Sequence, residues 1–316
     1  MLVHHACNQF IVGLKSIHPI TRMIKEGNFK HVSLIVEQKL RSKHYHKIIN
    51  FLHHNHIIYD QIYINRHSQQ VTIDAQIDLI ISCGKNYVHH MSRIGNVNKV
   101  SHYCIQTASG MISSYGADAN WFSKKTLVTP TIIFNDCIKW NKWGTLDTAY
   151  FLHTIPLALT ACITANNDTF ITTNAMNGIV NLLKVMRTVL LDHERYNKYL
   201  FNKKLAYGDI LVKTAYNNVK CPDFVTTLMQ HCENVTQFEL AITLLSTKIF
   251  KQVVMANNET IQKGLELSEC NINQLQQLFD DVYLAFTKQY ENDEITKKIL
   301  TPACLQAINE FELGGK

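Results

Sequence analysis

Glycine and proline are scarce in this chain of 316 residues, which holds 12 glycines and 5 prolines. Such low counts argue against long flexible linkers and glycine-signature repeats, and no repeat of fixed period is present. Charged residues are also few, at 18%, whereas hydrophobic residues reach 46%. This balance is typical of a folded globular protein rather than a disordered one. The length is sufficient for two domains with a well-buried core.

The nine cysteines stand singly, without any Cys-x-x-Cys pair. An odd count in a chain of this size argues against a disulfide framework and indicates a reducing compartment. The N-terminus lacks the charged start and apolar stretch of a signal peptide. The most apolar segment, 150–165, is shorter than the roughly 20 residues of a membrane span, so we interpret it as a buried core helix. We therefore expect a cytoplasmic protein with no membrane span.

The formal net charge is +6, and its densest basic stretch is 39–47. Positive charge of this kind attracts phosphorylated small molecules or nucleic acid. Because no zinc-finger or RNA-binding signature accompanies it, we expect a small molecule rather than nucleic acid as the ligand. The sixteen histidines gather mostly in short clusters that lack the i, i+4 spacing with an acidic partner of helical zinc sites. The clustered histidines are interpreted as surface residues.

Short β-branched runs alternate with amphipathic stretches in the first half of the chain. Strands are expected at 31–36, 57–64, 77–81, 102–105 and 131–134, and helices at 42–54 and 86–100. This alternation predicts a Rossmann-like α/β domain over residues 1–145, with a mainly parallel sheet and helices on both faces. Ligands of such sheets bind at the carboxyl ends of the strands.

Windows with a period of 3.6 residues dominate the second half. They cover 175–191, 205–219, 238–255 and 272–290, with no convincing strand among them. The pattern predicts an all-α C-terminal domain over residues 146–316. A cleft between an α/β domain and a helical domain is a common location for a small-molecule site.

Four segments of the first half carry polar or small residues at the ends of expected strands. They are 27–37, ending in Glu37; 78–85, with Ser82, Cys83, Gly84 and Lys85; 103–109, with Thr107 and Ser109; and 129–136. In this order and spacing they resemble the nucleotide-binding half of the superfamily of iron-dependent alcohol dehydrogenases, glycerol-1-phosphate dehydrogenases and dehydroquinate synthases.

The resemblance implies that NAD or NADP is the cofactor. It would be bound by Glu37, Ser82, Cys83, Gly84, Lys85, Thr107 and Ser109. An acid at a strand end accepts hydrogen bonds from ribose hydroxyls, and a glycine lets a pyrophosphate approach backbone N–H groups at a helix start. Of the family's three glycines only Gly84 remains. Each of these residues also has a purely structural interpretation. Glu37 could be an exposed acid at a strand end, Gly84 could serve a turn, and Thr107 or Ser109 could cap the next helix.

The second half resembles the family less closely. Pro156 or Leu157 holds the place of the first metal ligand, and neither can bind a metal. Asp209 and His231 stand where further ligands are expected. A catalytic zinc or iron ion normally needs about three protein ligands, so the resemblance leaves the metal site incomplete.

The function implied by the resemblance is that of an NAD(P)-dependent oxidoreductase acting on a small alcohol, phosphorylated or not. Without a metal, polarising the carbonyl oxygen would require a substitute donor such as Lys or His. One alternative is a dehydroquinate-synthase-like cyclase, with the same cofactor. Another is a pseudoenzyme that serves as a binding or regulatory partner of another protein. Whether the chain forms a homodimer is a separate question that the sequence leaves open.

Overall fold

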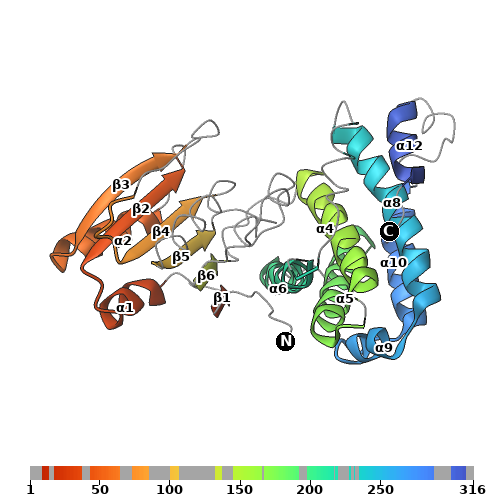
Figure 1. Ribbon diagram of the computed structural model, residues 1–316, viewed down its shortest axis with the longest axis horizontal. Coiled ribbons are helices and arrows are strands. Elements are labelled where there is room, and N and C mark those ends of the chain that lie inside the picture. The colour runs from red at the N-terminus through yellow and green to blue at the C-terminus, as the bar shows by residue number, and fades with distance from the viewer. Residues whose placement is uncertain are drawn as a thin grey trace. The chain divides into compact units, whose positions relative to one another are not determined.

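The computed structural model describes most of the chain in two units. The described residues are 9–13, 18–37, 43–64, 73–84, 100–106, 132–136, 145–165, 167–191, 198–216, 218–219, 228, 231, 235–287 and 300–310. One compact unit comprises Met1–Ala117 and Thr126–Lys142, and the other comprises Asp118–Lys125 and Trp143–Lys316. Every described strand belongs to the first unit, and the described elements of the second are all helices (Figure 1).

A six-stranded parallel sheet forms the centre of the first unit. Its strands are β1 (Gln9–Gly13), β2 (His31–Glu37), β3 (Ile58–Ile64), β4 (Leu79–Gly84), β5 (Ser101–Gln106) and β6 (Ile132–Asp136). Their order across the sheet is β1-β6-β5-β4-β2-β3, and every neighbouring pair is parallel. The predicted Rossmann-like fold with a parallel sheet is thereby confirmed, whereas helices on its second face stay a prediction. The segment predicted as a helix at 86–100 lies, except for its last residue, outside the described residues.

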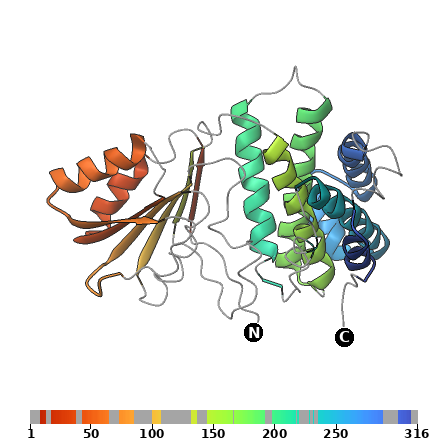
Figure 2. The same ribbon diagram turned by 90° about the horizontal axis from the view of Figure 1, so that it is seen from above.

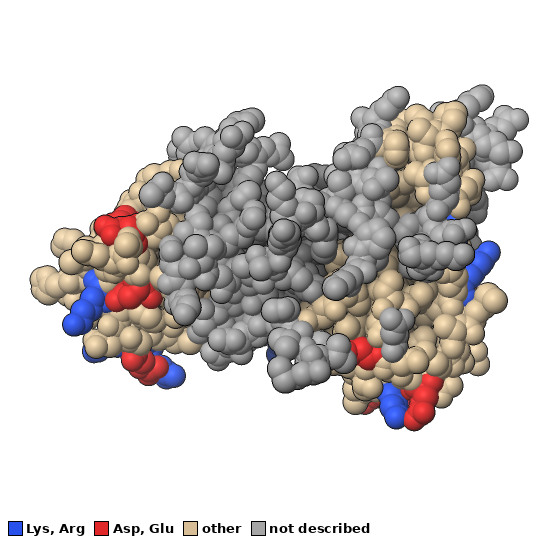
Figure 3. Space-filling view, in the orientation of Figure 1, with Lys and Arg blue, Asp and Glu red and all other residues tan. Residues whose placement is uncertain are grey.

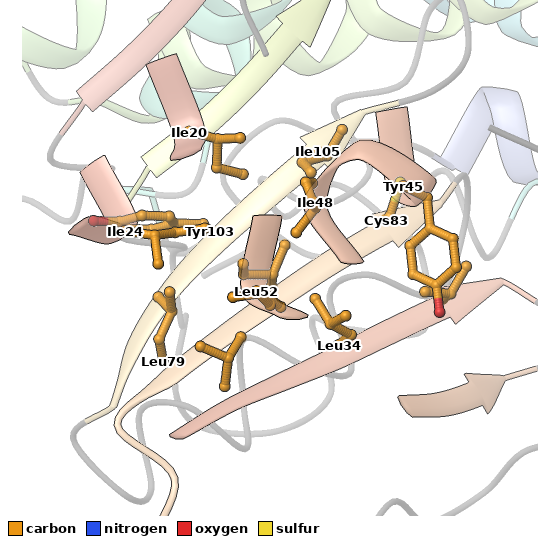
Figure 4. Packing of buried hydrophobic residues seen from close by; sticks show 13 residues of the cluster. Ile20, Ile24, Leu34, Tyr45, Ile48, Leu52, Leu79, Cys83, Tyr103 and Ile105 are labelled. Carbon is orange, nitrogen blue, oxygen red and sulfur yellow. The ribbon is translucent and has the colours of Figure 1, made fainter. Parts of the chain in front are cut away.

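Helices α1 (Pro19–Glu26) and α2 (Lys43–His54) cover one face of this sheet, as Figure 2 shows. Proline at the first position of α1 suits a helix start, where its missing N–H is not needed. Ile20 and Ile24 of α1, and Ile48 and Leu52 of α2, are almost completely buried (Figure 4). Alternate residues of the strands complete this core: Val32, Leu34, Val36, Leu79, Ile81, Cys83, Tyr103 and Ile105.

The second unit confirms the predicted helical region. Its helices are α4 (Thr145–Thr164), α5 (Thr169–Leu191), α6 (Lys198–Tyr216), α8 (Val235–Ala256), α9 (Glu259–Glu266), α10 (Ile272–Thr287) and α12 (Pro302–Glu310). The apolar segment 150–165 lies in α4 except for its last residue, and its described side chains are mostly buried, as expected for a core helix. Within the described ranges, no helix is both long and apolar enough to cross a membrane.

Two glycines allow α5 and α6 to approach closely. A Cβ at Gly178 of α5 would lie 2.9 Å from the backbone oxygen of Gly208 on α6, too near for any other residue. This crossing places Asp209, the next residue of α6, against the neighbouring helices. On the face of the molecule in Figure 3, the charged side chains of the described residues are scattered, with no large patch of one sign.

Candidate functional site

The carboxyl ends of β2 and β4 form the place where a ligand is expected. β2 lies between β3 and β4, and the chain runs from β2 outward to β3, whereas β4 continues in the opposite direction to β5. The connections that leave the two neighbouring strands therefore diverge. Such a reversal of strand order is where open α/β sheets bind ligands.

The register of the sheet brings two of the predicted site residues together. Ile35 pairs with Ser82 and Val36 with Cys83, so Glu37 at the end of β2 adjoins Gly84 at the end of β4. Gly84 in turn pairs with Gln106, the last residue of β5. Lys85, Thr107 and Ser109, which follow β4 and β5 in the chain, lie outside the described residues.

Ser82 and Cys83 lie inside β4, before its end. Cys83 is 2% exposed and belongs to the core beneath α2, together with Tyr45. Ser82 is completely buried and, because side chains alternate along a strand, points to the opposite face of the sheet. Their side chains are thus engaged in the interior, and a contact of either residue with a cofactor stays a prediction.

A buried hydrogen bond joins β4 to β5 just below this edge. Ser82 Oγ and His102 Nε2 are 2.5 Å apart. Burial lowers the pKa of His102 from 6.5 to about 3, so its imidazole is neutral at physiological pH. No sequence motif marks His102 as a functional residue. Its burial could be inferred only from the alternation of side chains along β5, which puts His102 on the face of the sheet opposite to Tyr103 and Ile105.

Asp209 lies in the interior of the helical unit. Its carboxylate accepts a hydrogen bond from the Thr154 hydroxyl of α4 at 3.5 Å, and both residues are 1% exposed. Thr154 stands two residues before Pro156, in the part of α4 where the resemblance places the family's first metal ligand. The structure thus brings Asp209 to that helix, and a role as metal ligand stays a prediction.

His231 is exposed and held through its backbone. Its carbonyl oxygen accepts hydrogen bonds from Cys304 Sγ at 2.7 Å and from the Thr301 hydroxyl at 3.4 Å, both at the start of α12. Among the described residues, no three His, Cys, Asp or Glu side chains gather into a group that could hold a metal ion. Asp209 and His231 therefore do not by themselves fit a zinc or iron ion.

No protein-family model and no curated protein sequence matches the chain. Solved structures match it over nearly its whole length. 1,3-Propanediol oxidoreductase matches with a TM-score of 0.63 at 16% identity, covering 98% of this chain and 90% of that one. Maleylacetate reductase from Rhizobium sp. strain MTP-10005 matches with a TM-score of 0.64 at 11% identity, covering 99% and 92%. Iron-containing alcohol dehydrogenase from Corynebacterium glutamicum matches with a TM-score of 0.54 at 13% identity, covering 96% of this chain and 92% of that one.

At such low identity the shared property is the fold. The resemblance inferred from four short segments is confirmed at this level, and it extends to the helical half, where the sequence signals were weakest. The chain has the fold of iron-containing alcohol dehydrogenases and maleylacetate reductases.

Proposed function

We propose that this chain is an oxidoreductase that binds NAD or NADP at the carboxyl ends of β2 and β4 and acts on a small alcohol or the corresponding carbonyl compound. The observation that carries the proposal is the adjacency of Glu37 and Gly84 where the strand order reverses. Further support comes from the whole-length likeness to proteins named as oxidoreductases, reductases and alcohol dehydrogenases.

Each proposed contact follows from the place of its residue at the end of a strand or in the chain directly after it. The Glu37 carboxylate accepts hydrogen bonds from the ribose hydroxyls, because it ends the strand next to the glycine. Gly84 has no Cβ, so the pyrophosphate reaches backbone N–H groups, while the Lys85 ammonium balances its charge. Thr107 and Ser109, after β5, donate hydroxyl hydrogen bonds to the same ligand. The bound dinucleotide supplies the hydride donor or acceptor.

Binding of the cofactor is the first test. Fluorescence titration of the purified chain with NADH and with NADPH should give micromolar affinity for at least one of them. Glu37→Ala should weaken NADH binding roughly 10- to 100-fold, the effect of losing hydrogen bonds to a charged group. Glu26→Ala removes another acid of the same unit, exposed at the end of α1, and should leave the affinity unchanged. Absence of binding of either nucleotide by the wild-type chain would refute the proposal.

The second candidate is a binding or regulatory protein that keeps the fold without the reaction. The placement of Asp209 favours it, because this carboxylate is buried and hydrogen-bonded by Thr154 as part of the helix packing. Metal analysis of the purified chain separates the candidates further. Zinc or iron at one equivalent, lost in Asp209→Asn, would support a retained metal centre and either dehydrogenase or cyclase chemistry. If the purified chain binds neither a metal nor a nucleotide, the result supports the binding or regulatory protein.

A further inference from the structure

A small pocket opens in the helical unit, where α5 meets the turn between α9 and α10 and the start of α10 (Figure 1). Its volume is about 240 Å³, below the roughly 300–1,000 Å³ of sites for drug-sized ligands, so it suits a smaller molecule. Charged and polar residues dominate its lining: Lys184, Arg187, Glu269, Cys270, Gln277 and Asp281.

One ion pair in this lining is satisfied within the wall. Arg187 Nε lies 2.5 Å from Asp281 Oδ2, and the other carboxylate oxygen of Asp281 accepts a hydrogen bond from the Gln277 amide at 2.7 Å. The charges of Arg187 and Asp281 therefore cancel. The charges that this pair leaves over in the pocket are the ammonium of Lys184 and the carboxylate of Glu269.

Lys184 keeps its positive charge at the pocket. Its ammonium donates to Ser268 O at 2.9 Å, and a carbonyl oxygen does not neutralise that charge. Burial raises the pKa of the neighbouring Cys270 thiol, while the charge of Lys184 opposes the rise. Because the net shift is upward, Cys270 is a neutral thiol at physiological pH and supplies no negative charge to Lys184. The ammonium thus suits the carboxylate of a ligand.

Glu269 occupies a backbone position at which glycine is usual. The N–H of Cys270 donates to Leu265 O at 3.1 Å and the N–H of Glu269 to Glu266 O at 2.9 Å, the two hydrogen bonds of a Schellman motif at the end of α9. The left-handed residue of this motif is Glu269, with φ 50°. Glycine adopts this conformation without the steric cost that a Cβ brings. A carboxylate is therefore placed at the pocket against the preference of the backbone.

The turn that carries Glu269 is fixed on both sides. Ser268 Oγ donates to Asn177 Oδ1 of α5 at 2.9 Å. Towards α10, Asn271 and Gln274 form a capping box, in which the side chain of each accepts a hydrogen bond from the backbone N–H of the other at 2.9 Å. Because this wall is ordered before a ligand arrives, little conformational entropy is lost on binding.

We propose that this pocket binds a small zwitterion of the α-amino acid class, with the ligand's carboxylate at Lys184 and its ammonium at Glu269. The two opposite charges of such a ligand match the two charges that the Arg187–Asp281 pair leaves over. Leu278, which also lines the pocket, offers an apolar contact to the ligand's side chain. The inference goes beyond the proposed oxidoreductase function. Its test does not depend on nucleotide binding, because all the residues involved belong to the helical unit.

Calorimetric titration of the whole chain with each of the standard L-amino acids tests the site. At least one of them should bind with a dissociation constant in the micromolar to millimolar range. Lys184→Met should weaken this binding roughly 10- to 100-fold, the effect of losing a hydrogen bond between charged groups. Lys203→Met removes an exposed lysine of α6 in the same unit and should leave the affinity unchanged. Absence of binding of every amino acid at millimolar concentration would overturn the proposal.

Glu269→Gly separates ligand binding from folding. Glycine suits the left-handed position, so this variant should be at least as stable in urea as the wild type and yet bind the amino acid roughly 10- to 100-fold more weakly. Glu269→Gln, which removes only the charge, should show the same loss of affinity. Glu266→Gln changes an exposed acid of α9 and should bind normally. Wild-type affinity in both Glu269 variants would contradict the proposed contact.

A ligand analogue tests the zwitterion itself. The carboxylic acid that lacks the amino group of the bound amino acid should bind to the wild type at least roughly 10-fold more weakly, because its contact with Glu269 is lost. Equal affinity for the two compounds would indicate a simple anion site at Lys184 and would overturn the assignment of a zwitterion.

Discussion

The buried imidazole of His102 makes the stability of the first unit depend on pH. Its pKa is about 3 in the folded chain, against an ordinary value of 6.5. Between these values the unfolded chain binds a proton that the folded chain does not. The free energy of unfolding therefore rises with pH through this window and falls as the pH drops below 6.5. From pH 7 to pH 5 this histidine alone removes about 2 kcal/mol, at 1.36 kcal/mol per pH unit below its unfolded pKa.

Urea unfolding of the wild type and of His102→Gln at pH 7 and pH 5 measures this effect. The wild type should lose about 2 kcal/mol more than the variant between the two pH values, because the carboxylates common to both proteins cancel in the comparison. His46→Gln is the control, because His46 is exposed on α2. This variant should lose as much free energy of unfolding between the two pH values as the wild type.

Equal losses in the wild type and in His102→Gln would refute the buried, neutral state of His102. Ser82→Ala provides a second variant if His102→Gln does not fold. It removes the hydroxyl partner but leaves the imidazole buried, so the pH dependence should persist at lower overall stability.

Two further predictions concern the helical unit. Gly178→Ala should lower the free energy of unfolding by about 1–3 kcal/mol in urea, because its Cβ would meet Val212 Cγ2 at 2.7 Å and the Gly208 backbone oxygen at 2.9 Å. Gly208→Ala should cost less, because the nearest atoms to its Cβ, Leu182 Cγ at 3.0 Å and Gly178 O at 3.1 Å, are farther away; a larger effect of Gly208→Ala would contradict these contacts. Lys248→Met should cost about 1 kcal/mol in the same assay, because its ammonium donates to two carbonyl oxygens at the end of α12. Lys251→Met, an exposed position on the same helix, should be neutral.

The sequence predicted the central strands well because their burial leaves a strong pattern. β2, β4 and β5 are runs of apolar and β-branched residues, and they were placed within one or two residues at their amino ends. β1 was not foreseen, because five residues ending in glycine give too short a signal, and this strand depends on its pairing with β6. The short helices α9 and α12 were missed because eight or nine residues span barely two turns of periodicity.

The candidate site likewise has residues that could be predicted from the sequence and a contact that could not. Glu37 and Gly84 could be selected from the sequence because parallel strands end at one edge, and their adjacency needed only the order of β2 and β4. The Ser82–His102 hydrogen bond joins residues 20 positions apart, and it depends on the pairing of β4 with β5 and on which face each side chain occupies. Such long-range pairing leaves no periodic trace in the sequence.

Calorimetric titration with NADH tests the proposed cofactor site most directly when three proteins are compared. Gly84→Val places a branched side chain at the end of β4, where the pyrophosphate should approach the backbone. Gly13→Val makes the same change at the carboxyl end of β1, the strand at the far edge of the sheet. We predict that the wild type and Gly13→Val bind NADH with the same micromolar affinity and that Gly84→Val shows no binding. Unchanged affinity of a folded Gly84→Val protein would contradict a dinucleotide site at the carboxyl ends of β2 and β4.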